Sequence, residues 1–320
     1  MSALIDLPPR LGDDQLKGFV DRHAVVLIGR TQAVAQHPVL GPLPVVTDLD
    51  QAKNCTGLVV IGGGMRIDLA KHWRAVHRPD AKLLAIATRH GSGAEANGIA
   101  VLDQDGVKTI QIGPEYRPDA RYYLPESLST LSGDDLLWCA ADSLTHAVEG
   151  LLSPMADAAL RAELAEIIGE MIKLGPSSDP RWFELSALAS AGQSQSSVGF
   201  VHGLAHELEG PCLAHLGART QLGHARLCGA FLAPVLRYNL QSSDKTRAHL
   251  AQHGVDLEAL LGLAEQLSRQ AFALGLPWAE LIRDNWRNIL KNPCTRTNAA
   301  TVRPGKLEEF LGLLPDMTAK

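Results

Sequence analysis

The sequence predicts an N-terminal α/β domain followed by a wholly helical C-terminal domain. Over the first 130 residues, short apolar runs alternate with amphipathic stretches, as in parallel strands joined by crossover helices. After Ser132 the chain changes to long stretches rich in Ala, Leu and Glu, and 157–174 and 257–274 both fit helical spacing. A chain of 320 residues is long enough for two domains, which we place at 1–130 and 131–320.

Three of the apolar runs, at 24–28, 57–61 and 82–87, are expected to be buried strands. Periodicity alone cannot separate a strand from a helix fragment in a run of about five residues. The β-branched residues and the glycines that follow these runs favour strands. The domain boundary is expected near 124–134, where Pro125, Ser132 and Gly133 interrupt the pattern and Asp134 can cap the next helix.

A glycine triplet, Gly62, Gly63 and Gly64, follows the strand 57–61 directly and leads into a helix. Without side chains, backbone N–H groups can approach a phosphate closely, and the positive end of the helix favours negative charge. A pyrophosphate is the natural ligand of such a turn. A tight turn without a ligand is the alternative, because the triplet is not the GxGxxG fingerprint.

A second turn of small and hydroxyl-bearing residues, which includes Thr88 and Ser92, follows the strand 82–87. Ligands of open parallel sheets bind at the carboxyl ends of the strands. Two such turns together predict a dinucleotide site.

The helical half carries side chains that can bind metals. Asp142 and His146 are four residues apart, so they share one helix face and can chelate one cation. For this pair alone, a hydrogen bond on a solvated face is the alternative. His202 and His206 repeat the spacing in an apolar stretch, with His224 further on, and a buried histidine without a partner is costly. Together these residues favour a metal site.

The motifs occur in an order that resembles the iron-containing (group III) alcohol dehydrogenases. The resemblance covers residues 57 to about 239, with Asn292-Pro293 as a closing motif. The motifs are Gly62-Gly63-Gly64-x-x-x-Asp68-x-x-Lys71, Thr88-x-x-Gly91-Ser92-Gly93-x-Glu95, Asp142-x-x-x-His146-x-x-Glu149, His202-x-x-x-His206, and Gly223-His224 before Pro234 and Arg237-Tyr238-Asn239.

The resemblance implies a dehydroquinate synthase-like fold, with a dinucleotide-binding α/β domain and an all-α metal-binding domain. It implies Fe(2+) or Zn(2+) and NAD(H) or NADP(H) as cofactors, and a homodimer. By position, the metal ligands are Asp142, His146, His202 and His224, the proton-relay residue is His206, and the cofactor-binding residues are Gly62, Gly63, Gly64, Asp68, Thr88, Ser92 and Lys108.

The activity implied is hydride transfer between a nicotinamide and a small alcohol or aldehyde, with the metal acting as a Lewis acid. The alternative is a non-redox lyase or cyclising synthase, because dehydroquinate synthase-like proteins combine the same two domains.

Three departures from the family pattern concern the ligand sites. The region 30–42 is short for a strand-helix-strand unit, so the N-terminal part of the cofactor domain is expected to be reduced. Arg89 and His90 stand where small or hydroxyl residues are typical. Arg89 can bind a phosphate, phosphonate or carboxylate bidentately, with a surface arginine as the alternative, and we name both residues as candidates for substrate binding. The long segment 207–222 is either a lid or an exposed loop, and its His215 is an alternative ligand to His224.

Composition excludes several other classes. The net charge of −5 and the absence of a basic run argue against nucleic acid as a partner. No apolar run reaches the length of a membrane span, and the N-terminus lacks the features of a signal peptide, so a cytoplasmic protein is expected. The 5 cysteines form no CxxC pair and are expected to be reduced and buried.

Overall fold

The computed structural model describes residues 5–23, 25–29, 31–104, 107–217 and 222–315. The chain forms two compact units. The α/β unit holds Asp6–Leu136 and Ser178–Ala191, and the helical unit holds Leu137–Ser177 and the chain from Gly192 onward, with Ile5. The sequence predicted one boundary near residue 130, whereas here the α/β unit also takes a short piece of the helical half.

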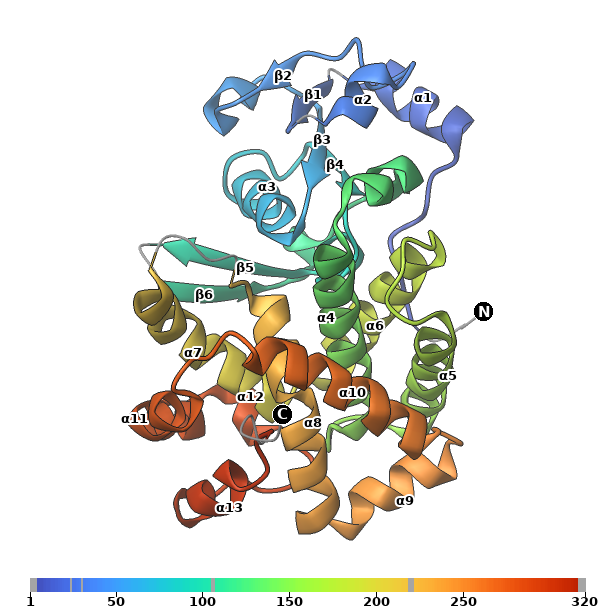
Figure 1. The fold of residues 1–320 in the computed structure, drawn as a ribbon. Coiled ribbons are helices and arrows are strands. Elements are labelled where there is room, and N and C mark those ends of the chain that lie inside the picture. The colour runs from blue at the N-terminus through green and yellow to red at the C-terminus, as the bar shows by residue number, and fades with distance from the viewer. Residues whose placement is uncertain (1–4, 24, 30, 105–106, 218–221, 316–320) are drawn as a thin grey trace. The chain divides into compact units, whose positions relative to one another are not determined.

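A parallel sheet is the centre of the α/β unit (Figure 1). It contains the three predicted strands, apart from residue 24, which lies outside the described residues. A separate antiparallel ribbon is formed by β5 (Ile99–Gln104) and β6 (Val107–Ile112). The sheet has the order β2-β1-β3-β4-β7, with β1 (Val25–Ile28), β2 (Val45–Val46), β3 (Gly57–Gly62), β4 (Lys82–Ala87) and β7 (Ala120–Tyr123).

Helices cover each face of the sheet. Alternate residues of a strand point to opposite faces, so the side chains of one strand contribute to both cores. Leu58 and Val60 of β3 pack in one core with residues of α3, while Val59 and Ile61 pack in a second core with residues of α1 and α2. Both faces of β3 are therefore buried, which explains its continuous apolar run. The helices are α1 (Asp13–Arg22), α2 (Gln32–Gln36) and α3 (Gly64–His77).

The short region between β1 and β3 does contain a helix and a strand, in reduced form. α2 has 5 residues and β2 has 2. Short 3₁₀ helices connect other elements of this unit: η1 (Leu49–Ala52), η2 (Ala94–Ala96), η3 (Pro114–Tyr116) and η4 (Pro125–Thr130).

The second unit is built from helices, as predicted. The predicted helices 157–174 and 257–274 correspond to α5 and α10. Its elements are most of α4 (Gly133–Leu152), α5 (Ala158–Leu174), the end of α6 (Arg181–Ser196), α7 (Phe200–Leu216), α8 (His224–Ser242), α9 (Asp244–Gln252), α10 (Leu257–Phe272), α11 (Trp278–Lys291), α12 (Pro293–Arg296), η5 (Pro304–Lys306) and α13 (Leu307–Leu311).

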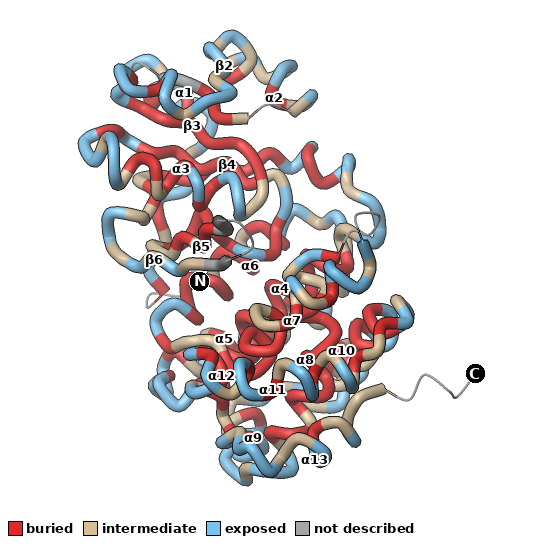
Figure 2. Tube along the Cα trace, turned by 90° about the vertical axis from the view of Figure 1, so that its left-hand side faces the viewer, coloured by how far each residue is buried: buried red, intermediate tan, exposed pale blue. Residues whose placement is uncertain are grey.

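The helix α4 is buried along most of its length (Figure 2). It begins at Gly133, one residue before the predicted cap Asp134, so that prediction is wrong. Ser132 caps it instead. The Ser132 hydroxyl accepts a hydrogen bond from the Asp135 backbone at 3.1 Å, and the Asp135 carboxylate accepts one from the Ser132 backbone at 3.1 Å.

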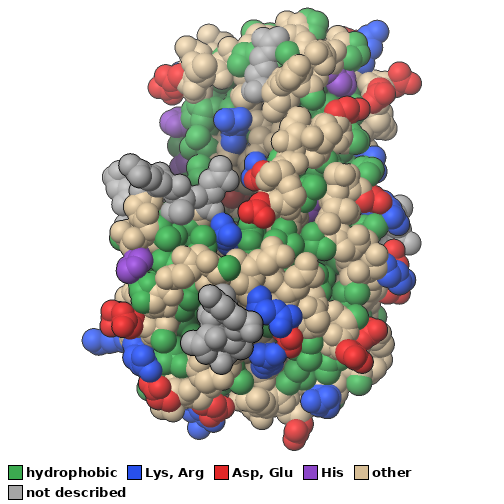
Figure 3. Space-filling view, in the orientation of Figure 1, with side chains coloured by type: hydrophobic (Ala, Val, Ile, Leu, Met, Phe, Trp, Pro, Cys, Tyr) green, Lys and Arg blue, Asp and Glu red, His purple; other side chains and the backbone are tan. Residues whose placement is uncertain are grey.

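No helix among the described residues is long and apolar enough to cross a membrane. On the face drawn in Figure 3, basic and acidic side chains are interspersed.

A charged cluster is buried in the α/β unit around Glu95, which is 2% exposed. Burial raises the pKa of the Glu95 carboxyl to about 7, although its own backbone N–H and the positive charges of Arg121 and Lys71 oppose the shift. Arg121 itself forms a bidentate ion pair with Glu184 at 2.8 and 2.9 Å. Glu95 is therefore protonated over a pH range in which an exposed glutamate is ionised.

The substitution Glu95→Gln is expected to flatten the pH dependence of stability between about pH 4.5 and 7. The folded protein keeps the Glu95 proton up to about pH 7, whereas the unfolded chain loses it near 4.5. Within this window the folded state binds more protons, so the free energy of unfolding falls as the pH rises. Urea unfolding at pH 5 and pH 7 measures the fall, with Glu126→Gln, an exposed site, as the control. An equal fall in wild type and Glu95→Gln would contradict the expectation.

Candidate metal and cofactor site

Asp142 and His146 lie on the buried face of α4, 4% and 7% exposed. The distance between Asp142 Oδ1 and His146 Nδ1 is 3.9 Å, too long for a hydrogen bond. Neither atom has a hydrogen-bond partner among the described residues. The alternative of a hydrogen bond on a solvated face is therefore wrong. Buried polar atoms left in this way are costly unless a ligand satisfies them.

Two histidines of α7 face the same region of the helical unit. His202 is 3% exposed. The centroid of its ring lies 4.8 Å from the ring centroid of His146 and 5.9 Å from that of His206. His206 is half-buried. Their spacing of one helical turn places both rings on one side of α7, as the sequence predicted.

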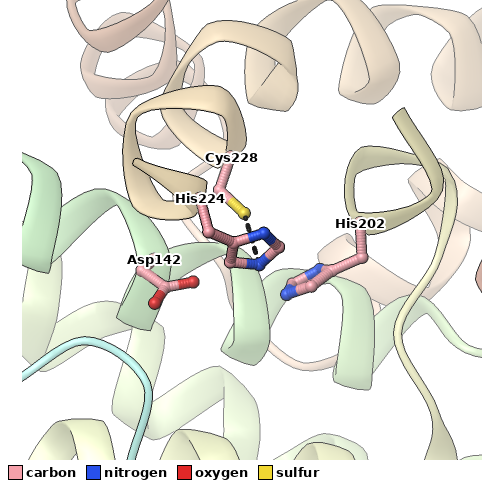
Figure 4. A group of neighbouring side chains, drawn as sticks. All are labelled: Asp142, His202, His224 and Cys228. Carbon is pink, nitrogen blue, oxygen red and sulfur yellow. Dashed lines mark hydrogen bonds between the residues drawn. The ribbon is translucent and has the colours of Figure 1, made fainter. Parts of the chain in front are cut away.

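His224 is the first residue of α8 and completes the histidine cluster. Its ring lies 5.2 Å from that of His202 and 5.0 Å from that of His206. One turn later, Cys228 Sγ lies 3.5 Å from His224 Nε2. One ligand atom from each of Asp142, His202, His224 and Cys228 lies within 4.8 Å of the others. In the view of Figure 4, His224 stands between Asp142 and His202, with the sulfur beside its ring.

Glu149 of α4 fixes the orientation of His202. Its carboxylate accepts hydrogen bonds from the backbone of Gly199 at 2.8 Å and of Val201 at 2.6 Å, where α7 begins. The distance from Glu149 Oε2 to His202 Nδ1 is 2.7 Å, so Nδ1–H can donate and Nε2 remains for a metal. Burial raises the pKa of Glu149 to about 7, although these backbone hydrogen bonds lower it. A cation bound at His202 would favour the ionised carboxylate.

The donor set suits a divalent transition metal. One carboxylate oxygen and imidazole nitrogens from three helices are ligands of both Fe(II) and Zn(II). The unsatisfied Oδ1 of Asp142 and Nδ1 of His146 fit the same interpretation. The residues therefore fit the metal that the resemblance implies.

His206 lies beside this group without belonging to the set of four ligand atoms. Its Nδ1 is 3.8 Å from Cys294 Sγ. Burial raises the pKa of the Cys294 thiol to about 12, so that this neighbour is neutral at physiological pH.

In the α/β unit, the two predicted turns meet. Gly62 and Ala87 are partners at the ends of β3 and β4, and the Thr88 backbone donates a hydrogen bond to the Gly62 carbonyl at 3.1 Å. A Cβ at Gly64 would come within 2.5 Å of the Ser92 hydroxyl. Glycine is therefore required where the second turn touches the start of α3.

The predicted cofactor residue Asp68 has a different partner. Its Oδ1 pairs with Lys71 at 3.1 Å and its Oδ2 accepts a hydrogen bond from the Val101 backbone at 3.1 Å, with the side chain buried. Asp68 thus joins α3 to β5, and both of its oxygens are engaged. Lys108 lies on β6, but its side chain is outside the described part of the structure.

The predicted substrate residues Arg89 and His90 have different surroundings. The Arg89 side chain is 48% exposed, packs beside Gly63 and lies 3.6 Å from the Asp135 carboxylate. His90 is 2% exposed and stacks on Trp182, with 4.9 Å between ring centroids. The ring of His90 is thus buried in the α/β unit, and its assignment to the substrate stays a prediction.

The segment 207–222 is not a free loop in its first part, because α7 continues to Leu216 with Pro211 inside it. Residues 218–221 lie outside the described residues. His215 is exposed on the last turn of α7, whereas His224 lies against His202. Of the two alternatives, His224 is therefore the one in the cluster.

Sequence reasoning missed Cys228 and gave no role to Glu149. Cys228 follows His224 by four residues, the spacing that singled out Asp142 with His146. That spacing was the available signal for the cysteine. The contact between Glu149 and His202 joins residues 53 apart, so only the packing of α4 against α7 reveals it.

No protein-family model matches the chain. It is similar to alcohol dehydrogenase 4 of Schizosaccharomyces pombe, with 25% identity over 62% of this chain and 53% of that protein. It is also similar to 4-hydroxybutyrate dehydrogenase of Cupriavidus necator, with 27% identity over 70% of this chain and 66% of that protein. The matches thus span about half to two thirds of the length of these curated relatives.

The fold is similar to that of an iron-containing alcohol dehydrogenase from Thermococcus thioreducens, with a TM-score of 0.77 and 19% identity. The match covers 96% of this chain and 98% of that one. An α/β domain and a helical domain with a histidine and aspartate cluster are thus the features that this chain offers for comparison. The comparisons confirm the resemblance to the iron-containing alcohol dehydrogenases and the predicted fold class.

Proposed function

We propose that this protein is a metal-dependent, NAD(P)-linked alcohol dehydrogenase or aldehyde reductase that acts on small substrates. The observation that carries the proposal is the buried cluster in which donor atoms of Asp142, His202 and His224 lie within 4.8 Å of one another. The names of the two curated relatives, both dehydrogenases of alcohols, support the same chemistry.

Asp142, His146, His202 and His224 would hold Fe(II) or Zn(II), which as a Lewis acid would polarise a carbonyl oxygen of the substrate. Glu149 keeps His202 in the tautomer that presents Nε2. His206 would exchange the proton of the alcohol with solvent through Nε2, since its Nδ1 faces Cys294.

The two turns of the α/β unit would bind the cofactor. The start of α3 offers backbone N–H groups and a positive helix end to a pyrophosphate. The hydroxyl of Ser92, which lies against Gly64, is placed to add a hydrogen bond. NAD(H) and NADP(H) both remain candidates.

An anionic substrate is part of the proposal. Arg89 is the residue that would bind the anionic group of the substrate. Its half-exposed side chain lies beside the glycine turn, and its ion pair with Asp135 is long, at 3.6 Å. The name of 4-hydroxybutyrate dehydrogenase, whose substrate carries a carboxylate, supports it. The proposal includes a homodimer and a cytoplasmic location, which the sequence predicts.

Isotope transfer tests the proposed reaction. Protein reconstituted with Fe(II) or Zn(II) is incubated with NADH or NADPH that carries deuterium at both C4 positions and with small aldehydes, with and without a carboxylate. We expect deuterium on the carbinol carbon of the product, in an amount equal to the oxidised cofactor formed. Turnover that consumes no nicotinamide would instead support the lyase or synthase alternative.

A further inference from the structure

Cys228 is a buried thiol beside the proposed metal ligands, and neither the resemblance nor the proposed reaction gives it a role. It is fully buried, one helical turn after His224 on α8. Its sulfur is within 4.8 Å of a donor atom of each of Asp142, His202 and His224. His146 is not one of this set of four, although it shares the buried face of α4 with Asp142.

A second observation at the same place points to a cation. Asp142, whose carboxylate is drawn beside His224 in Figure 4, is 4% exposed, and its Oδ1 has no hydrogen-bond partner among the described residues. A buried carboxylate oxygen without a hydrogen bond is stabilised by a positive charge. The Cys228 sulfur lies within 4.8 Å of an oxygen of this carboxylate.

The measured spacing agrees with coordination by sulfur. Two ligands of a tetrahedral zinc, a sulfur at about 2.3 Å and a nitrogen at about 2.05 Å, are separated by roughly 3.6 Å. The distance between Cys228 Sγ and His224 Nε2, which share a hydrogen bond in this structure (Figure 4), is 3.5 Å. Both side chains therefore already stand at the separation that a shared metal requires.

We propose that Cys228 is a metal ligand together with Asp142, His202 and His224, in the position given above to His146, and that its sulfur shifts the preference of the site from Fe(II) towards Zn(II). The inference rests on the proposed metal site. When the metal binds, the S–H bond of Cys228 breaks, the sulfur donates an electron pair to the metal, and the proton is released to solvent. Thiolate ligands favour zinc, whereas carboxylate and imidazole sets accept iron more readily.

Cobalt substitution tests the proposal in the intact protein. Metal-free protein receives one equivalent of Co(II), and a thiolate ligand then produces an intense sulfur-to-cobalt charge-transfer absorption in the near ultraviolet. We expect this band in the wild type and its loss in Cys228→Ser and Cys228→Ala. Cys212→Ser, a buried cysteine of α7, is the matched control and should keep the band.

Competition between Zn(II) and Fe(II), read by metal analysis after dialysis, gives the second readout. The preference for Zn(II) should fall at least about tenfold in Cys228→Ser. A wild-type protein that binds one Co(II) without the charge-transfer band would overturn the role of Cys228 and leave the metal site in place. Variants of Cys228 that keep both the band and the preference for Zn(II) would do the same. A wild type that binds no Co(II) at all would overturn the proposed function itself.

Discussion

Replacing His202 with alanine is expected to remove the metal and to lower kcat/KM by at least about a thousandfold. The residue is buried, lies 4.8 Å from the ring of His146 and 5.2 Å from that of His224, and is oriented by Glu149. Alanine deletes the imidazole nitrogen that His202 would give to the metal, while the other proposed ligands stay on α4 and α8. Lewis-acid stabilisation contributes several kcal/mol to such reactions, and about 4 kcal/mol corresponds to a thousandfold.

Metal content per chain and steady-state kinetics measure the effect of His202→Ala. His215→Ala is the control, because His215 is exposed on the last turn of the same helix. Binding of NADH or NADPH, followed by fluorescence, should persist in both variants. A His202→Ala protein that keeps one metal and its activity would show that His202 is not a metal ligand.

Replacing Gly64 with valine is expected to weaken cofactor binding by about a hundredfold while leaving the metal content unchanged. A Cβ at this position would lie 2.5 Å from the Ser92 hydroxyl and 2.9 Å from the Ser92 Cβ, so the two turns must separate. Separation displaces the backbone N–H groups at the start of α3. The loss of two hydrogen bonds to a charged phosphate, at about 1.5 kcal/mol each, gives an effect of this size.

Fluorescence titration with NADH and NADPH measures the affinity. Gly262→Val is the matched control, because Gly262 is exposed on α10 and a Cβ there meets nothing within 4 Å. Ser92→Gly in the Gly64→Val protein removes the colliding side chain and should recover part of the affinity relative to Gly64→Val. Unchanged affinity in Gly64→Val would mean that the glycine turn does not hold the cofactor.

Local sequence determined the elements and the residue types of the site. Apolar runs that end in glycine or hydroxyl residues predicted the strands β3 and β4 and the turns after them. Such elements depend on interactions between residues close together in the sequence. The spacing of Asp142 with His146, and of His202 with His206, placed each pair on one helix face for the same reason.

Only the tertiary structure decided which of these side chains meet. Asp68 looked available for a cofactor, but β5, distant in sequence, engages its carboxylate, and Trp182 from another segment encloses His90. The packing of α4, α7 and α8 places Glu149 and Cys228 beside the proposed metal ligands. The neighbours of a side chain in space depend on contacts between segments far apart along the chain. Hydrophobic periodicity indicates helices and strands, but it does not indicate which of them pack together.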